Sequence, residues 1–316
     1  MSTTAFPSPA APLHDVLCVG LVCVDLLLSV PHHPASDEKL RANSRLVAPG
    51  GPAAVAAAQV SRLGGRAAFA GLIGDTAADP FASLLLGAFA TEGIDTSALV
   101  SATGFETSLA AILVKPDASR AVVSHRPAPS DTTPIPAPNF PAARVLLADG
   151  HRPEWNNALL AHARATGAPL VLDAGSWSDS VRALAPRADH LVASEACARA
   201  ALGGADPASV SPAALRVALA ARPDATVVVT LGPRGLVWSR SDAAGTAPAF
   251  RIEATDTTGA GDAFHGAYAL GLARGLPFPE ILRLASVAGA LTCTRPGAWP
   301  ALPTEDEVDA FLSLPS

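Results

Sequence analysis

One stretch of the chain combines small and acidic residues at a spacing suited to phosphate chemistry. It reads Asp256-Thr257-Thr258-Gly259-Ala260-Gly261-Asp262, and a helical pattern follows from Gly259 onward. The N–H groups in a helix's first turn have no partners within the helix, and the helix dipole favours an anion there. Because Gly259, Ala260 and Gly261 let a phosphate approach the backbone, we expect them to form an anion hole.

Asp262 adds a carboxylate to the same first turn. Phosphoryl transfer needs this pairing, because amides stabilise the moving phosphoryl group while a carboxylate takes the proton of the attacking hydroxyl. We therefore expect Asp262 to be the catalytic base. A bare GxGD is more often a helix cap with packing glycines, whereas the whole string DTTGAGDAF favours catalysis.

Two earlier features suit the binding of an acceptor. Gly50 and Gly51 precede an expected helix, and paired glycines allow a tight turn with close approach of a ligand. Asp25 lies in an apolar strand, where a carboxylate is costly unless it has partners. The alternatives are a simple loop-to-helix turn for the glycines and a surface-facing strand end for Asp25.

A later Gly-punctuated turn suits a nucleotide. Thr230, Gly232 and Gly235 belong to the segment TLGPRG, which follows an expected strand. Such turns are common, so the segment is weak evidence alone. We expect residues 284–289 to form a further helix.

Short apolar runs alternate with alanine-rich helical stretches along the chain. This alternation predicts an α/β fold with a central, mostly parallel β-sheet flanked by helices and right-handed connections. The expected strands are 16–28, 67–73, 108–115, 121–125, 145–148, 170–174, 190–193 and 226–230, and the expected helices are 52–63, 80–92, 156–166, 179–185 and 213–221.

The runs 108–115 and 121–125 flank a polar turn and predict a hairpin that stands out from the main sheet. We expect one domain over 16–314, with a lid formed by about 26–48 and 106–128. Residues 127–141 are proline-rich and indicate a surface crossing. The segment 1–15 has the composition of a flexible N-terminal tail.

Composition excludes several classes of protein. The net charge is −6 and charged residues make up 16% of the chain, with no basic block, which argues against nucleic acid and anionic membranes as partners. The apolar run 16–30 is too short to span a membrane and contains Asp25. The N-terminal segment has no positive charge and so does not resemble a secretory signal, and four cysteines without a CxxC pair indicate reduced thiols in the cytoplasm.

The string DTTGAGDAF, the glycine pair and TLGPRG together resemble the ribokinase-like (PfkB) family of carbohydrate kinases, over roughly residues 16–312. The resemblance implies an α/β core with a small β lid, MgATP as donor, and transfer to a hydroxymethyl group. It carries Asp262 over as the base and Gly259, Ala260 and Gly261 as the anion hole. The ATP contacts it implies are Thr230, Gly232, Gly235, Thr258, Gly259, Gly261 and Ser286.

The same resemblance puts Asp25, Gly50 and Gly51 against the sugar. Details are closest to the ketohexokinase and sulfofructose kinase branches, and Lys39 has the spacing of a sulfonate-contacting lysine. Val55 stands where many relatives have a sugar-binding Asn. We expect a fructose-like ketose as substrate. An anionic sugar such as sulfofructose, a ribose or nucleoside acceptor, and an inactive ligand-binding member remain alternatives.

The candidate anion-recognising residues are Lys39, His125, Arg126, His151 and Arg152. The family's Asn-x-x-Glu element, which organises Mg²⁺ waters, is replaced here by Ser194 and Cys197. Glu195 is the substitute that we expect to act through water. Asp256 lies where relatives bind a monovalent cation such as K⁺. Because members often pair through their lids, we also expect a homodimer.

A rival class is a dinucleotide-dependent oxidoreductase. It requires GxGxxG after the first strand, whereas Gly20 stands alone there.

Overall fold

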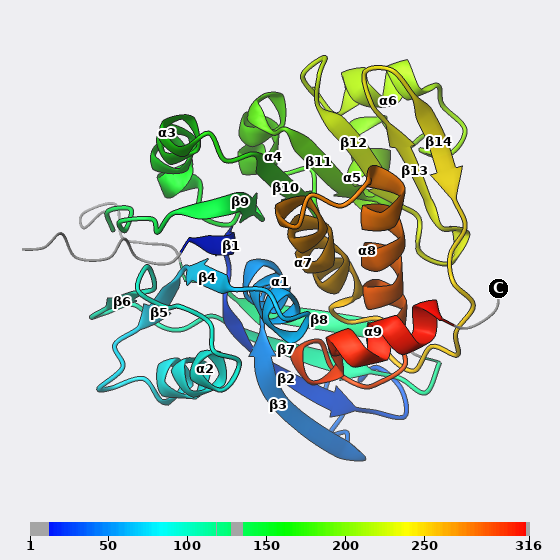
Figure 1. Cartoon of the computed structure of the whole chain (residues 1–316). Coiled ribbons are helices and arrows are strands. Elements are labelled where there is room, and N and C mark those ends of the chain that lie inside the picture. The colour runs from blue at the N-terminus through cyan, green and yellow to red at the C-terminus, as the bar shows by residue number, and fades with distance from the viewer. Residues whose placement is uncertain (1–12, 118, 128–134, 314–316) are drawn as a thin grey trace, which may run out of the picture.

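The computed structural model describes residues 13–117, 119–127 and 135–313, and its main sheet confirms the predicted fold class (Figure 1). Among these residues, eight strands lie in the order β14-β13-β12-β11-β10-β9-β1-β4. The strands from β4 to β12 run parallel, and β13 and β14 are antiparallel. Their bounds are β1 His14–Val19, β4 Ala67–Ala70, β9 Ala143–Ala148, β10 Leu170–Ala174, β11 His190–Ser194, β12 Thr226–Thr230, β13 Leu236–Ser239 and β14 Ala244–Ala247.

Helices cover both faces of this sheet. Successive strand residues point to opposite faces, so Val16 and Cys18 enter one apolar core while Leu17 and Val19 enter the other. The first core is covered by α1 (Pro52–Arg62), α2 (Pro80–Thr91), α7 (Ala260–Ala273), α8 (Phe278–Thr292) and α9 (Glu305–Leu312). The second is covered by α3 (Asn156–Thr166), α4 (Asp179–Leu184), α5 (Glu195–Ala201) and α6 (Pro212–Ala218).

A separate four-stranded sheet, which we call the small sheet, projects from the body beside α1 (Figure 1). Its order is β3-β2-β7-β8, with β2 at Cys23–Ser29, β3 at Ser44–Gly50, β7 at Leu109–Val114 and β8 at Arg120–His125. The strands β7 and β8 form the predicted antiparallel hairpin. A further pair, β5 (Leu72–Gly74) and β6 (Val100–Ala102), lies apart from both sheets.

Two strands predicted as continuous are each divided. The run 16–28 separates into β1 and β2, because the Leu21 N–H donates to Oδ2 of Asp149 (2.9 Å) and the chain leaves the main sheet there. The run 67–73 likewise separates at Gly71 into β4 and β5. Residues 1–12 of the expected tail lie outside the described residues, and β1 begins at His14.

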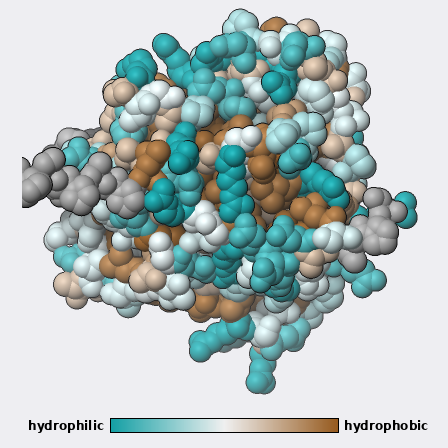
Figure 2. All heavy atoms as spheres, in the orientation of Figure 1, coloured by the Kyte–Doolittle hydropathy of each residue, from teal (hydrophilic) through white to brown (hydrophobic). Residues whose placement is uncertain are grey.

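Figure 2 shows apolar side chains gathered toward the middle of the face viewed, ringed by hydrophilic ones. The described helices include none that is both long and apolar enough to cross a bilayer. All four cysteines are free, and Cys18, Cys23 and Cys197 are buried.

Candidate active site

The carboxyl ends of the parallel strands meet at one edge of the main sheet. In register, Val19 pairs with Ala148, and Ser194 pairs with Thr230. Ligands of open α/β sheets bind at this edge. Asp149 follows β9 directly, and Asp173 lies near the end of β10, so the topology brings acidic side chains together there.

The helix α7 begins at this edge with open amides. Gly259 is its N-cap residue at φ 79°, and a β-carbon there would stand 2.6 Å from the Ala298 side chain, so glycine is required. Among the described residues, the N–H groups of Gly261 and Asp262 have no protein acceptor, as expected in a first helical turn. Gly261 is exposed and faces open space. This geometry can receive an anion.

Asp262 is half-buried in the same first turn. Burial raises the pKa of its carboxyl to about 7, and the nearby carboxylate of Asp173 acts in the same direction. Asp149 and Asp25 add smaller contributions to that rise in pKa, while His265 opposes it. A carboxylate poised near neutral pH is suited to general base catalysis.

Asp25 lies on β2 and faces the site. Burial raises the pKa of Asp25 to about 6, although Cys23 (Sγ to Oδ1, 3.3 Å) and Arg126 act to lower it. A β-carbon on Gly50 would stand 2.2 Å from Oδ2 of Asp25, so only glycine fits beside this carboxylate. Gly51 is the N-cap residue of α1 at φ 96°. The structure therefore brings Asp25, Gly50 and Gly51 together.

One face of the small sheet, which we call the inner face, carries Asp25 together with Arg120. Cross-strand register and alternation place both on this face. Arg120 Nη1 donates to Thr257 Oγ1 (2.8 Å), at the loop before α7. Arg126, just past β8, contacts His151 instead (Nη1 to Nε2, 3.0 Å). The two arginines thus reach the two ends of the site.

Asp149 joins three segments at the sheet edge. Its Oδ2 accepts hydrogen bonds from the N–H groups of Leu21 (2.9 Å) and Ala53 (3.1 Å), and its Oδ1 accepts from the His151 N–H (2.8 Å). Burial alone would raise the pKa of Asp149, but His151 and these amides hold it below its usual value. The carboxylate in turn raises the pKa of His151.

Two other basic candidates face elsewhere. His125 lies on the opposite face of the small sheet and contacts Glu106 (Nε2 to Oε2, 2.7 Å). Arg152 is buried beside Glu154 (3.2 Å). Neither is placed to receive a sugar anion together with Arg126.

Asp256 is buried and links the loop before α7 to the loop that contains Gly297. Its Oδ1 accepts from the Thr258 N–H (2.9 Å) and hydroxyl (2.7 Å), and its Oδ2 accepts from the Gly297 N–H (2.8 Å). These bonds fix the segment that leads into α7. Thr258 is therefore held next to the open amides at the start of α7.

The Ser194-Glu195 segment has other partners than a metal. Ser194 is the N-cap residue of α5, and its hydroxyl accepts from the Cys197 N–H (3.0 Å). Glu195 Oε1 accepts from Arg199 (2.7 Å) and Arg234 (2.9 Å), which lower its pKa. Two guanidinium groups already neutralise this carboxylate. The proposal below therefore does not assign the Mg²⁺ waters to Glu195.

The expected nucleotide residues lie along the same side of the main sheet. Thr230 ends β12, and Gly232 and Gly235 adopt φ values of 57° and 87° in the turn that follows. Ser286, on α8, borders a groove of about 390 Å³. The groove is lined mainly by apolar and aromatic side chains, among them Trp238, Phe250, Phe278 and Leu282.

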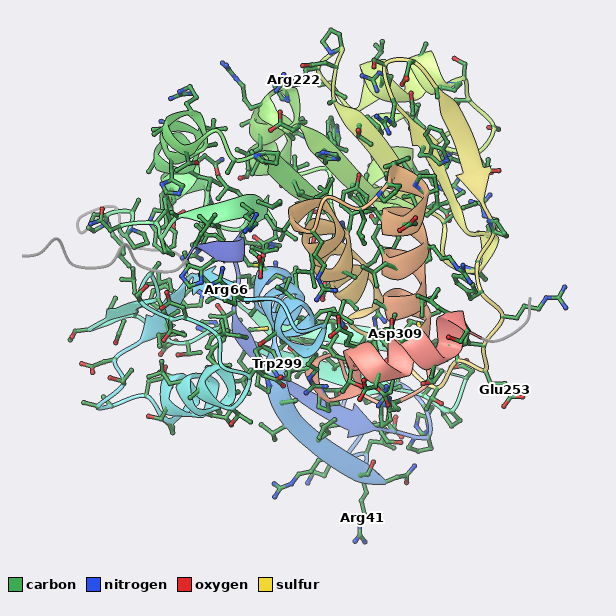
Figure 3. All side chains as sticks on the ribbon, viewed as in Figure 1. Arg41, Arg66, Arg222, Glu253, Trp299 and Asp309 are labelled. Carbon is green, nitrogen blue, oxygen red and sulfur yellow. The ribbon has the colours of Figure 1, made fainter. Side chains whose placement is uncertain are left out.

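Lys39 is exposed in the loop 30–43 between β2 and β3, and among the described residues it makes no ion pair or hydrogen bond. Figure 3 shows Arg41, two residues further along this loop, extending away from the body. The structure does not bring Lys39 together with Asp25.

Sequence reasoning missed Asp149, Asp173, His265 and Arg120. A usable signal existed for the two aspartates, since each sits at the carboxyl end of an apolar strand in an α/β pattern. His265 could have been noted one helical turn after Asp262. Arg120 had no signal, because only the placement of the small sheet brings it to Thr257.

The chain matches the pfkB family of carbohydrate kinases over residues 13–305. It is 30% identical to fructokinase-1 of Zea mays, covering 95% of this chain and 98% of that protein. It is 26% identical to the ribokinase of Bacillus subtilis, covering 95% and 100%. The solved structure of a fructokinase with bound ATP from Xylella fastidiosa superposes with a TM-score of 0.73 and 25% identity, covering 94% and 98%.

The fold, the family match and the similarity to known sugar kinases together identify the class of protein. The chain belongs to the PfkB family of carbohydrate kinases and is a sugar kinase. The dinucleotide alternative is wrong, because β1 leads into β2 of the small sheet with no intervening helix.

Proposed function

We propose that the protein transfers the γ-phosphate of MgATP to a primary hydroxyl of a fructose-like ketose. One observation carries the proposal: Asp262, half-buried beside the open amides at the start of α7, lies within electrostatic range of Asp25 on the small sheet. A base, an anion site and a second carboxylate for sugar hydroxyls thus share one edge of the fold.

In this reaction ionised Asp262 accepts the proton of the sugar hydroxyl. The oxygen then bonds to the γ-phosphorus, and the bond from that phosphorus to the β–γ bridging oxygen breaks, so ADP keeps that oxygen. The open amides of Gly261 and Asp262 and the dipole of α7 stabilise the charge on the moving phosphoryl group. Thr258, Thr230, Gly232 and Gly235 contact the donor, and the adenine lies toward Ser286.

Mg²⁺ bound with ATP would shield the phosphate charge and so help the acceptor oxygen to approach the γ-phosphorus. The described residues hold no cluster of three His, Cys, Asp or Glu side chains arranged for a metal. In proteins Mg²⁺ usually keeps several waters and binds one or two carboxylates together with substrate phosphates. We therefore propose that Mg²⁺ is brought to the site by ATP, as the MgATP complex. K⁺ near Asp256 is a further proposal, tested by the activity in K⁺ against tetramethylammonium.

On the acceptor side, we assign the sugar hydroxyls to Asp25 and the space against Gly50 and Gly51. The small sheet acts as a lid over about 26–48 and 106–128 and keeps water from the phosphoryl group. Arg120 supports this assignment, because it already links the inner face to Thr257.

A second candidate is an anionic sugar. Arg126 influences Asp25 and contacts His151, and its guanidinium has no carboxylate partner within 4 Å among the described residues. A phosphate or sulfonate on the sugar would fit between Arg126 and His151. Lys39 is a weaker contributor, since it lies exposed in the loop 30–43.

We also propose that two chains pair through the outer face of the small sheet, opposite Asp25. Leu26, Val47, Ala111 and Val123 form a cross-strand row there, with Val47 43% and Val123 70% exposed. Light scattering after size-exclusion chromatography tests this pairing. We place the enzyme in the cytoplasm, where ATP is available and thiols stay reduced.

An ADP-release assay with MgATP tests the function. The panel contains fructose, fructose 1-phosphate, fructose 6-phosphate, sulfofructose, ribose and adenosine. The highest kcat/KM on fructose supports the first proposal, and the highest on a phosphorylated or sulfonated ketose supports the second. Preference for ribose or adenosine contradicts both, and no turnover with any sugar supports the inactive alternative.

A further inference from the structure

The ring of His265 is held between two backbone carbonyl groups. Its Nδ1 lies 2.6 Å from the oxygen of Gly261, and its Nε2 lies 3.1 Å from the oxygen of Val192 on β11. A carbonyl oxygen only accepts hydrogen bonds, so both contacts are satisfied together only when both ring nitrogens carry hydrogen. An imidazolium cation would satisfy both contacts at once, and the ring would then link the start of α7 to the main sheet.

The carboxylate of Asp173 lies next to the His265 ring. Asp173 Oδ1 lies 3.4 Å from His265 Nε2, and both side chains are about 5% exposed or less. Asp173 Oδ2 is buried without a hydrogen-bond partner among the described residues. Burial raises the pKa of Asp173, and His265 acts in the opposite direction. Burying either charge alone is costly, whereas an opposite charge compensates each of them.

Both members of this pair act on the pKa of Asp262. The groups that act on Asp262 are Asp173 from β10, Asp149 from the end of β9, Asp25 from β2, and His265 from α7 itself. His151 acts on Asp149 and Asp173. The three carboxylates all favour protonated Asp262, and His265 is the group among these that favours its ionised form.

We propose that His265 is a positioning residue for phosphoryl transfer: as an imidazolium paired with Asp173, it fixes the Gly261 carbonyl at the start of α7 and keeps Asp262 ionised. The inference rests on the proposed function, in which Asp262 is the base and Gly261 belongs to the anion hole. It adds a buried charge pair that a merely structural histidine would not provide.

The test uses His265→Gln, which keeps a donor but removes the charge. The acid limb of kcat/KM against pH should move upward by roughly one pH unit, so activity at pH 6.5 falls about 10-fold and recovers near pH 9. The double variant His265→Gln/Asp173→Asn removes the opposing charge as well, and its acid limb should return to the wild-type position or below it.

The matched control is His190→Gln. His190 is half-buried and is also bonded to α7, through Nδ1 to the Tyr268 hydroxyl (2.9 Å), but it contacts no group of the site. Its acid limb should stay at the wild-type position. A loss of kcat in His265→Gln that is equal at all pH values, with no displacement of the limb, would overturn the proposal while leaving the kinase assignment intact.

A second measurement needs no activity. In the protein labelled with ¹⁵N-histidine, the His265 ring is assigned as the signal that disappears in His265→Gln, because Asp149 also raises the pKa of His151. The proposal expects this ring to carry hydrogen on both nitrogens at pH 8.5, where exposed histidines are neutral. If this ring is neutral at that pH, the proposal fails even if the enzyme is an active kinase. If it is doubly protonated in a protein that phosphorylates no sugar, the proposed function fails and the charge pair stands.

Discussion

Gly50 lies directly against Asp25, and a β-carbon on Gly50 would stand 2.2 Å from Oδ2 of that carboxylate. The substitution Gly50→Ala must therefore displace Asp25 from its position. We expect KM for the sugar to rise at least ~10-fold, since misplacements on the order of 1 Å are costly to reaction geometry. KM for ATP should change little. Gly87→Ala on α2, where an added β-carbon meets no atom within 4 Å, is the control.

Asp262→Asn tests the base. The amide has nearly the same shape but cannot accept the hydroxyl proton, so kcat should fall by at least ~10². ATP binding, measured by calorimetry, should survive because the amides of α7 are unchanged. A variant with nearly normal kcat would remove Asp262 from its assigned role.

The pH dependence of the wild-type enzyme follows from the pKa of Asp262, which is about 7. The base works only when ionised, so kcat/KM should rise with pH and level off above that value. Buffers from pH 5.5 to 9 with saturating MgATP measure the limb. A profile that is already flat at pH 5.5 would contradict a raised pKa.

The ionisation of Asp262 should also affect the stability of the fold: as pH rises, activity should increase while the free energy of unfolding decreases. The pKa of Asp262 is raised from 3.8 to about 7 in the folded protein, so the folded state holds a proton that the unfolded chain has released between these values. The free energy of unfolding contributed by this group falls as pH rises through this window. Asp262→Asn should therefore raise Tm at pH 8 by roughly 2–4 °C, and much less at pH 4.5. Scanning calorimetry at both pH values measures the difference.

Arg126 and Lys39 should differ in how much each contributes to binding an anionic sugar. Arg126→Gln should raise KM for fructose 6-phosphate or sulfofructose by about 10-fold or more and change KM for fructose little, because a charge-assisted contact is lost. Lys39→Ala should have the smaller effect of the two on the anionic sugars, since Lys39 lies exposed in the loop 30–43. Equal effects of Arg126→Gln on neutral and anionic sugars would exclude an anion site there.

Local pattern was sufficient where neighbours in sequence are also neighbours in space. The string from Asp256 to Asp262 predicted the open helix start with Asp262 in its first turn, because a first helical turn is built from consecutive residues. The same holds for the β7–β8 hairpin, whose turn and strands adjoin in the chain. The alternation of apolar strands and helices likewise predicted the layered fold.

Contacts between distant segments were decided by tertiary structure alone. The division of the run 16–28 into two strands depends on Asp149, 128 residues after Leu21. The ion pair between Glu195 and Arg234, 39 residues further along the chain, likewise depends on the fold. Arg120 and Arg126 reach Thr257 and His151 only through the placement of the small sheet.

The sequence by itself therefore determined the reaction class, because the residues of the phosphate-binding turn are contiguous and their backbone amides need no distant partner. The tertiary structure decided which charges surround the base and the acceptor. Asp25, Asp173 and His265 share one electrostatic environment with Asp262, although they come from separate strands and a helix. Their effect depends on distance and burial, and both are properties of the packed chain.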